Sequence, residues 1–284
     1  MCDDLTQSDN ERMLATGLSR RGFGAAAAAV GIAAALPSPA DALPIRGRDV
    51  VIKTPDGECD AYFVAPAGGR HPAVLVWPDI FGLRPAFRQM ADRLAQSGYA
   101  VLTVNQFYRS TRTPFASAAD GMTPAFRDKV MPWRALLTPE ATRRDATAFL
   151  AFLDEQANVD RGRGAASTGY CMGGPMVMMT AAAVPARVHA GATFHGGELA
   201  SEQNLALIPA MKASWLIAIA ANDDARAPDD KVKLRAAFAA AKRPAEIEVY
   251  QGTMHGWCPP DSQVYNQAQA EHAWARQLAL LAKV

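Results

Sequence analysis

The chain has 284 residues, 50% of them hydrophobic, and a formal net charge of +1 at pH 7. A chain of this length and composition can bury a large core, and α/β domains of this size are often single domains. The near-neutral charge gives no argument for a nucleic acid or another strongly acidic partner. No apolar run reaches the roughly 20 residues of a membrane-spanning helix, so no stable membrane anchor is predicted.

The N-terminal segment has the layout of an export signal. Arg20 and Arg21 form an arginine pair, an alanine-rich apolar stretch follows over residues 25–36, and small residues precede a cleavage point after Ala42. This order resembles a bacterial twin-arginine signal peptide. It predicts transport by the twin-arginine export machinery, a periplasmic or secreted location, and a mature domain over residues 43–284. An alanine-rich tail without a targeting role is the alternative.

The mature domain would retain three cysteines, Cys59, Cys171 and Cys258. An odd number of cysteines in an oxidising compartment leaves at least one free thiol or an intermolecular link. A nucleophilic Cys171 would account for the odd cysteine. Whether Cys59 and Cys258 pair with each other or are buried separately stays open.

Strands and amphipathic helices alternate along the mature chain, and the last element is a long helix. The predicted strands span residues 49–53, 59–65, 73–77, 99–104, 165–168, 190–194, 215–221 and 246–250. This alternation predicts a single α/β domain with a mostly parallel, doubly wound sheet. In such sheets, functional groups gather at the carboxyl ends of the strands.

Residues 106–138 interrupt this regular pattern with a long connection that is rich in aromatic side chains. A long ordered loop at the active edge of a sheet often covers the substrate. A surface insertion with a small apolar cluster of its own is the other interpretation, and the sequence does not separate the two.

The most informative motif is Gly-Tyr-Cys-Met-Gly at residues 169–173, between a predicted strand and a predicted helix. A sharp turn from strand to helix exposes its central side chain, here Cys171, and small residues on either side relieve crowding at the bend. The unpaired N–H groups at the start of the helix lower the pKa of a nearby thiol. The motif therefore predicts a cysteine nucleophile, and a buried structural cysteine is the alternative.

Two later strands are followed by the partners that such a nucleophile needs. A base must take the thiol proton, and a third group must orient that base. Asp223 and Asp224 follow the strand at residues 215–221, and His255 follows the last predicted strand. The order nucleophile, acid, histidine is that of the α/β-hydrolase fold. The residues alone do not separate the two aspartates, because aspartates in loops commonly form local turns.

Four separated motifs resemble the dienelactone hydrolase family, a cysteine branch of the α/β-hydrolase fold, from about Val50 to the C-terminus. They are Trp-Pro-Asp-Ile-Phe-Gly at residues 77–82, the elbow, Asp224 four residues before a proline, and the segment from Tyr250 to His255-Gly. The resemblance favours Asp224 as the acid, because the family's acid precedes a proline by four residues. It also implies that Asp79, where the family has a glutamate, contacts the thiol and gates its activation.

The implied reaction is hydrolysis of an ester or lactone by Cys171, His255 and Asp224 through a thioester, without cofactor or metal. His255 would take the thiol proton while the sulfur attacks the carbonyl carbon. The backbone N–H groups of Met172 and Ile80 are the expected donors to the developing oxyanion. Each such donor is typically worth about 3 kcal/mol in the transition state.

The substrate contacts are expected to differ from those of the family. Family members that act on dienelactone hold its carboxylate with arginines, one of them four residues after the histidine, and this chain has Pro259 there. Arg109 is the candidate for the other arginine, with a solvated loop arginine as the alternative. His195, Tyr108 and Trp257 are further candidates for residues that contact the substrate.

Two other functions remain open on the sequence. Cys171, Asp224, His255 and Cys258 could converge as zinc ligands, and His255 and Cys258 have a ligand-like spacing. Against zinc, only one close pair of such residues is present, whereas structural zinc sites usually have two. A catalytically silent ligand-binding protein on the same fold is the third possibility.

Overall fold

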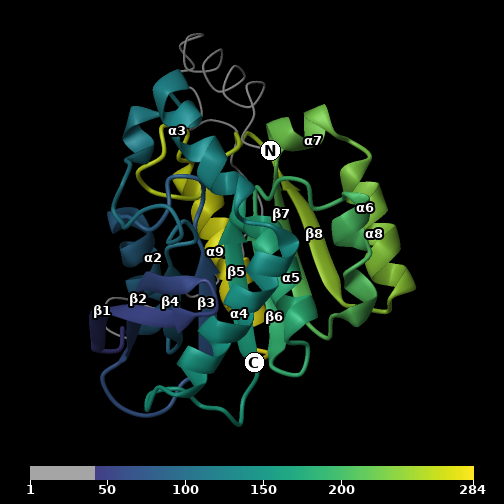
Figure 1. The fold of residues 1–284 in the computed structure, drawn as a ribbon. Helices are drawn as coiled ribbons and strands as arrows, with labels where there is room; N and C mark the ends of the chain where they lie inside the picture. The colour runs from purple at the N-terminus through teal and green to yellow at the C-terminus, as the bar shows by residue number, and fades with distance from the viewer. Residues whose placement is uncertain (1–41) are drawn as a thin grey trace.

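The structure is a computed structural model that describes residues 42–284 (Figure 1). The predicted export signal lies outside the described residues except for its last residue, Ala42. Within the described range, no helix is both long and apolar enough to cross a membrane.

An eight-stranded sheet forms the centre of the domain, with the strand order β1-β2-β4-β3-β5-β6-β7-β8. The first two pairings, β1 with β2 and β2 with β4, are antiparallel, and the other neighbours are parallel. All predicted strands are present, which confirms the mostly parallel α/β sheet of a single domain. The strands are β1 (Ile45–Thr54), β2 (Gly57–Pro66), β3 (Ala73–Trp77), β4 (Ala100–Val104), β5 (Ala165–Tyr170), β6 (Val188–Phe194), β7 (Ser214–Ala220) and β8 (Ala245–Tyr250).

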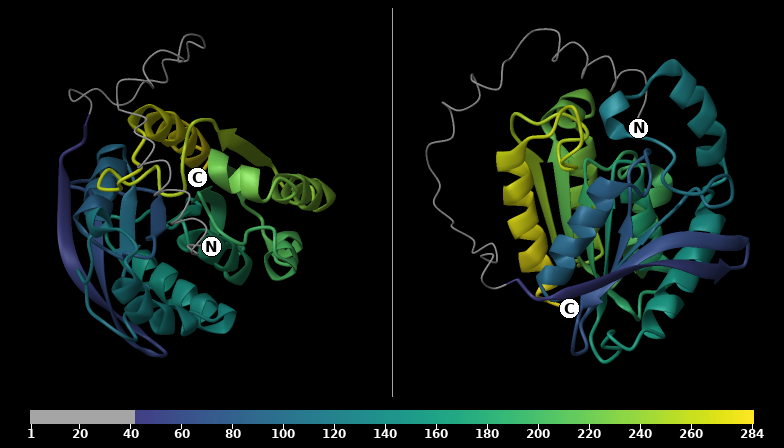
Figure 2. Two further views of the ribbon diagram at one scale, coloured as in Figure 1. Left: turned by 90° about the horizontal axis from the view of Figure 1, so that it is seen from above. Right: turned by 90° about the vertical axis from the view of Figure 1, so that its left-hand side faces the viewer.

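Helices cover both faces of the sheet (Figure 2). Apolar side chains of α2 and α9 pack on one face, and those of α4, α5 and α8 pack on the other. Because both faces are covered, β3, β4 and β5 are buried along their whole length. The continuous apolar run of β3 predicts this burial. The helices are α2 (Pro85–Gln96), α3 (Pro124–Ala135), α4 (Pro139–Asp154), α5 (Gly173–Ala183), α6 (Glu202–Leu205), α7 (Ala221–Arg226), α8 (Asp230–Ala240) and α9 (Gln267–Leu281), with 3-10 turns η2 (Ala118–Asp120) and η3 (Ile208–Ala210).

The connection at residues 106–138 is ordered and contains η2 and α3. A threonine begins α3, because the Thr123 side chain accepts a hydrogen bond from the third helical N–H and a proline follows it, which suits a helix start. Phe107, Phe115 and Trp133 pack against one another with ring centroids 5.4–6.1 Å apart. Phe107 belongs to the main apolar cluster beneath α4 and α5, and Phe115 and Trp133 pack against it, so the connection joins the core of the domain. Its helix α3 lies at the same edge of the sheet as α7, which follows β7 directly (Figure 1).

Candidate active site

Cys171 lies in a sharp turn between β5 and α5, as the elbow motif predicts. Its φ angle is +54°, a left-handed conformation that costs energy for any residue other than glycine. Two backbone hydrogen bonds of 3.0 Å hold it there: its N–H donates to the carbonyl of Phe194, and its own carbonyl accepts from the N–H of Gly174. The strained backbone is therefore fixed by the neighbouring strand β6 and by the first turn of α5.

The glycines on either side of Cys171 are required by close backbone packing. A Cβ atom on Gly169 would lie 2.3 Å from the carbonyl oxygen of Gly173, and a Cβ atom on Gly173 would lie 2.4 Å from that of Trp77. Neither backbone atom can give way without moving a strand or the helix. The elbow and the loop after β3 are consequently packed directly against each other.

His255 follows β8 and is held by two side chains from α7. Its Nδ1 lies 2.7 Å from Oδ2 of Asp223, and its backbone N–H donates to the side-chain oxygen of Asn222 at 2.8 Å. The His255 side chain is 5% exposed and that of Asp223 20%. This is the geometry of a carboxylate that fixes the tautomer and orientation of an imidazole.

Asp224, the predicted acid, occupies a different position. Both of its carboxylate oxygens bind Nζ of Lys231, at 2.6 and 2.8 Å. Successive residues of a helix point about 100° apart, so on α7 only one of the two aspartates faces the histidine. The structure gives that place to Asp223, and the prediction of Asp224 as the partner of His255 is corrected.

His195 lies against His255 at the end of β6, with their ring centroids 5.0 Å apart in an edge-to-face arrangement. Its φ angle is +42°, and its backbone N–H donates to the carbonyl of Ala218 at 2.8 Å. The ring is buried, and among the described residues neither of its nitrogens has a hydrogen-bond partner. Burial, reinforced by the charge of a protonated His255, lowers the pKa of His195 well below its usual value. His195 also connects the two halves of the site, because the residue before it, Phe194, binds the N–H of Cys171.

The two predicted oxyanion donors lie on the loops that meet at the elbow. Ile80 follows β3 in a tight turn closed by the N–H of Gly82, which donates to the carbonyl of Asp79 at 2.9 Å. Met172 directly follows Cys171 and precedes the first residue of α5. Within residues 42–284, neither the Ile80 N–H nor the Met172 N–H donates to a protein acceptor. Their role as oxyanion donors stays a prediction.

The model of the dienelactone hydrolase family matches residues 59–284. The chain belongs to this family. A relative from Salmonella typhi named "Putative carboxymethylenebutenolidase" is 26% identical over 260 residues, 82% of this chain and 91% of its own. A relative of the same name from Methylorubrum extorquens is 28% identical over 278 residues, 92% of this chain and 91% of its own. A crystal structure of a "Putative Dienelactone Hydrolase" from Klebsiella pneumoniae, at 23% identity, shares the fold with a TM-score of 0.73 over 84% of this chain and 99% of its own.

Asp79, expected from the dienelactone hydrolase resemblance to contact the thiol, is instead bound to Arg84. The two carboxylate oxygens accept from the guanidinium at 2.7 and 3.0 Å, and one also accepts from the Phe81 N–H. Arg84 is only 1% exposed and also binds Asp261 with two hydrogen bonds of 2.7 and 3.0 Å. A buried guanidinium requires such carboxylate partners, which explains why Asp79 turns to it. The sequence interpretation missed Arg84, whose partner Asp261 is remote in the chain.

Arg109 and Tyr108, expected to contact the substrate, are engaged in a buried polar cluster. Arg109 binds Asp145 with two hydrogen bonds of 2.8 Å and Asp56 with one of 2.6 Å. The hydroxyl of Tyr108 donates to Asp145 at 2.7 Å. Burial raises the pKa of Asp145, although Arg109 opposes this shift. These contacts join α4 to the β1–β2 turn and engage both side chains within the protein, and their contact with a substrate stays a prediction.

Trp257, a further candidate for substrate contact, is fully buried and stacks on Tyr250 with ring centroids 4.7 Å apart. Its position is in the core, on the face covered by α2 and α9. The candidate is therefore corrected to a packing residue beneath the histidine loop.

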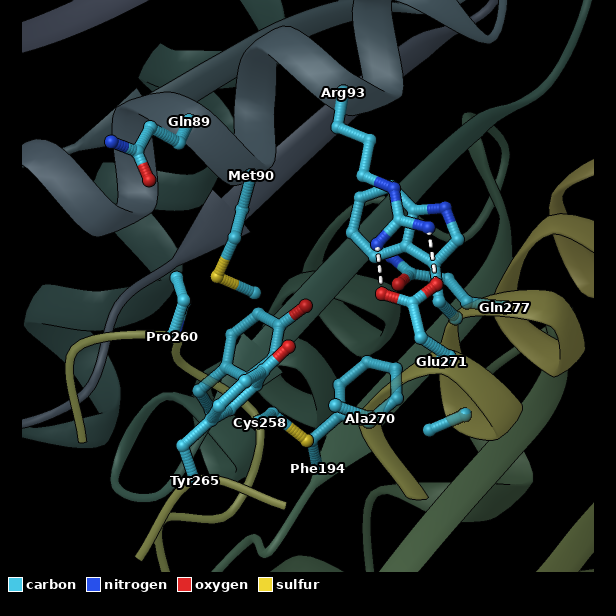
Figure 3. A pocket seen from close by; sticks show the side chains of 13 residues that line it. Gln89, Met90, Arg93, Phe194, Cys258, Pro260, Tyr265, Ala270, Glu271 and Gln277 are labelled. Atoms are coloured by element: carbon cyan, nitrogen blue, oxygen red, sulfur yellow. Dashed lines mark hydrogen bonds and ion pairs between the residues drawn. The ribbon is translucent and has the colours of Figure 1, made fainter. Parts of the chain in front are cut away.

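Cys59 and Cys258 are both free and buried, and they belong to the apolar clusters on opposite faces of the sheet. Burial raises the pKa of both thiols well above the usual value. Cys258 lines a cavity of about 180 Å³ between α2 and α9, together with Phe194 and Tyr265 (Figure 3). In the described part of the chain, no three His, Cys, Asp or Glu residues converge as metal ligands. The set proposed for zinc is thus not brought together.

Proposed function

We propose that the protein hydrolyses a carboxylic ester or lactone through Cys171, His255 and Asp223. The observation that carries this proposal is the 2.7 Å contact between Asp223 and His255 at the sheet edge where β5 turns sharply at Cys171. Membership of the dienelactone hydrolase family and the carboxymethylenebutenolidase name of its relatives support a lactone or ester as the substrate.

In the proposed reaction, the imidazole of His255 takes the thiol proton while the sulfur of Cys171 attacks the carbonyl carbon. Asp223 keeps the Nδ1 proton in place, so that Nε2 is the basic atom, and it stabilises the imidazolium that forms. The negative charge that develops on the carbonyl oxygen is held by the N–H groups of Met172 and Ile80. His255 then protonates the leaving oxygen, and it activates the water that hydrolyses the thioester.

The test is turnover of p-nitrophenyl acetate by the full chain kept reduced, compared with Cys171→Ala. We expect the wild type to release p-nitrophenol catalytically and Cys171→Ala to lose this activity. Acid quenching during turnover should trap one acetyl group on the peptide that contains Cys171, detected by mass spectrometry. Equal turnover by Cys171→Ala would show that the nucleophile is wrong. No turnover of any ester or lactone would favour a silent ligand-binding protein instead.

We also propose that the protein is exported through the twin-arginine machinery. The support is the sequence alone: the arginine pair Arg20-Arg21, the apolar stretch and the small residues before the cleavage point. The three cysteines of the mature domain would then meet an oxidising compartment. Cys59 and Cys258 are protected there by burial on opposite faces of the sheet.

A further inference from the structure

A cavity of about 280 Å³ lies beside the elbow, between α3, α5 and the loop after β6. Two of its lining residues adjoin Cys171. Met172 follows it directly and carries one of the two proposed oxyanion donors, and the N–H of Gly197 donates to the Cys171 carbonyl at 3.4 Å. A carbonyl group bound at Met172 would therefore have its acyl substituent next to this cavity.

The walls of the cavity are mainly apolar. Four methionines line it, and methionine side chains adapt to ligands of irregular shape. Thr142 is a buried polar residue of the lining. Its hydroxyl is enclosed and has no hydrogen-bond partner within the described structure. The methionines are Met131, Met172, Met176 and Met179.

The charges at the rim neutralise each other. Nη2 of Arg134, on α3, lies 3.6 Å from Oε1 of Glu198, in the loop after β6. The two side chains are 30% and 46% exposed. The backbone of Glu198 is fixed in a left-handed turn with a φ angle of +60°. Among the described residues that line the cavity, these paired charges leave no excess positive charge to attract an anionic substituent.

We propose that this cavity binds the acyl group of the substrate and selects neutral acyl groups of about six carbons. The inference rests on the proposed function, because it presumes an acyl-enzyme at Cys171. A cavity of about 150 Å³ lined by apolar side chains holds one benzene ring, so 280 Å³ accommodates a six-carbon chain. Acetyl groups would leave most of the cavity unfilled.

The predicted signature is a preference for longer acyl chains. Hexanoyl carries four more methylene groups than acetyl, and burying all four would be worth on the order of 100-fold. We expect kcat/KM for p-nitrophenyl hexanoate to exceed that for the acetate at least tenfold. The adipate monoester, with the same chain length and a terminal carboxylate, should be poorer than the hexanoate.

The matched variants place the same large side chain inside and outside the cavity. Ala135 lines the cavity at the end of α3, whereas Ala125, at the start of the same helix, is exposed and is not among the lining residues. Ala135→Trp should lower the ratio of hexanoate to acetate kcat/KM at least fivefold, and Ala125→Trp should leave that ratio unchanged. If Ala135→Trp does not fold, Met179→Phe fills the cavity from α5 and should lower the ratio in the same way.

The outcomes separate this inference from the proposed function. If no ester is turned over, the proposed function fails. If the acetate is turned over in a manner that depends on Cys171 but the hexanoate is no better, the cavity inference alone is overturned. It is also overturned if the folded Ala135→Trp and Met179→Phe variants keep the wild-type ratio, or if the adipate monoester is the better substrate.

Discussion

The pairing of His255 with Asp223 makes a prediction that the family pattern does not make. Replacing Asp223 by Asn keeps the size of the side chain but removes the charge that accepts the Nδ1 proton at 2.7 Å. In a serine triad, the corresponding change lowers kcat about 10⁴-fold. A thiol is more acidic than a serine hydroxyl and depends less on its base. We therefore expect kcat/KM to fall about 10²- to 10³-fold, or about 3–4 kcal/mol of transition-state stabilisation.

Asp224→Asn is the matched control, because it makes the same chemical change at the neighbouring position. This variant loses the ion pair with Lys231, whose side chain is 25% exposed against 19% for Asp224. Partly exposed ion pairs contribute at most about 1 kcal/mol to stability. The variant should therefore remain folded and keep kcat/KM within about threefold of the wild type.

The assay is hydrolysis of a p-nitrophenyl ester by both variants, with thermal unfolding as a check that each is folded. A large loss for Asp223→Asn together with near-wild-type activity for Asp224→Asn supports the observed pairing. The reverse order would refute the assignment and restore Asp224 as the acid. Equal, small effects would show that neither carboxylate orients the histidine during the reaction.

Three further outcomes are expected. Burial lowers the pKa of His195 in the folded state. Below about pH 6.5, the usual pKa of histidine, the unfolded chain therefore binds a proton at this residue that the folded chain does not bind. The free energy of unfolding should consequently fall as the pH drops below that value, by up to about 1.4 kcal/mol per pH unit. His195→Asn, which tolerates a positive φ, should flatten this slope in urea unfolding measured from pH 7 to 5; an unchanged slope would contradict the assignment. Arg109→Met should lower the free energy of unfolding by about 3–5 kcal/mol, because it leaves the charge of Asp145 buried without an arginine partner. The kcat/KM of the folded fraction for an ester should change little. A selective rise in KM would instead support Arg109 as a substrate contact. Replacing Arg20 and Arg21 by lysines should retain the protein in the cytoplasm on fractionation of the bacterial cells, and export at the wild-type level would refute a twin-arginine signal.

The parts of the fold that could be predicted are those that depend on residues close together in the sequence. Continuous apolar runs located strands such as β3, because a strand covered on both faces needs no alternation. The elbow was equally readable, since only small residues fit at Gly169 and Gly173, where a Cβ atom would meet backbone oxygens. His255 could be predicted because it lies in the loop that follows the last strand, β8.

The parts that could not be predicted depend on contacts between remote residues. The choice between Asp223 and Asp224 is decided by the rotation of the short helix α7, and no periodic pattern in a six-residue helix reveals that rotation. Arg109 follows β4, and one of its partners is Asp145 on helix α4, 36 residues away. Without knowledge of that contact, an arginine after a strand at the active edge has the same appearance as a substrate-binding residue.

Arg84 joins two loops that are remote in sequence, one carrying Ile80 and the other following His255, through Asp79 and Asp261. Loss of either acidic residue alone would leave the buried guanidinium of Arg84 without one of its two carboxylate partners, where water cannot replace it. Positions 84 and 261 should accordingly change together during the divergence of relatives, with both kept or both replaced. Exchange of the loop after β8 between homologues, a common route to new specificity, would succeed only when the donor loop brings its own acidic residue for this arginine.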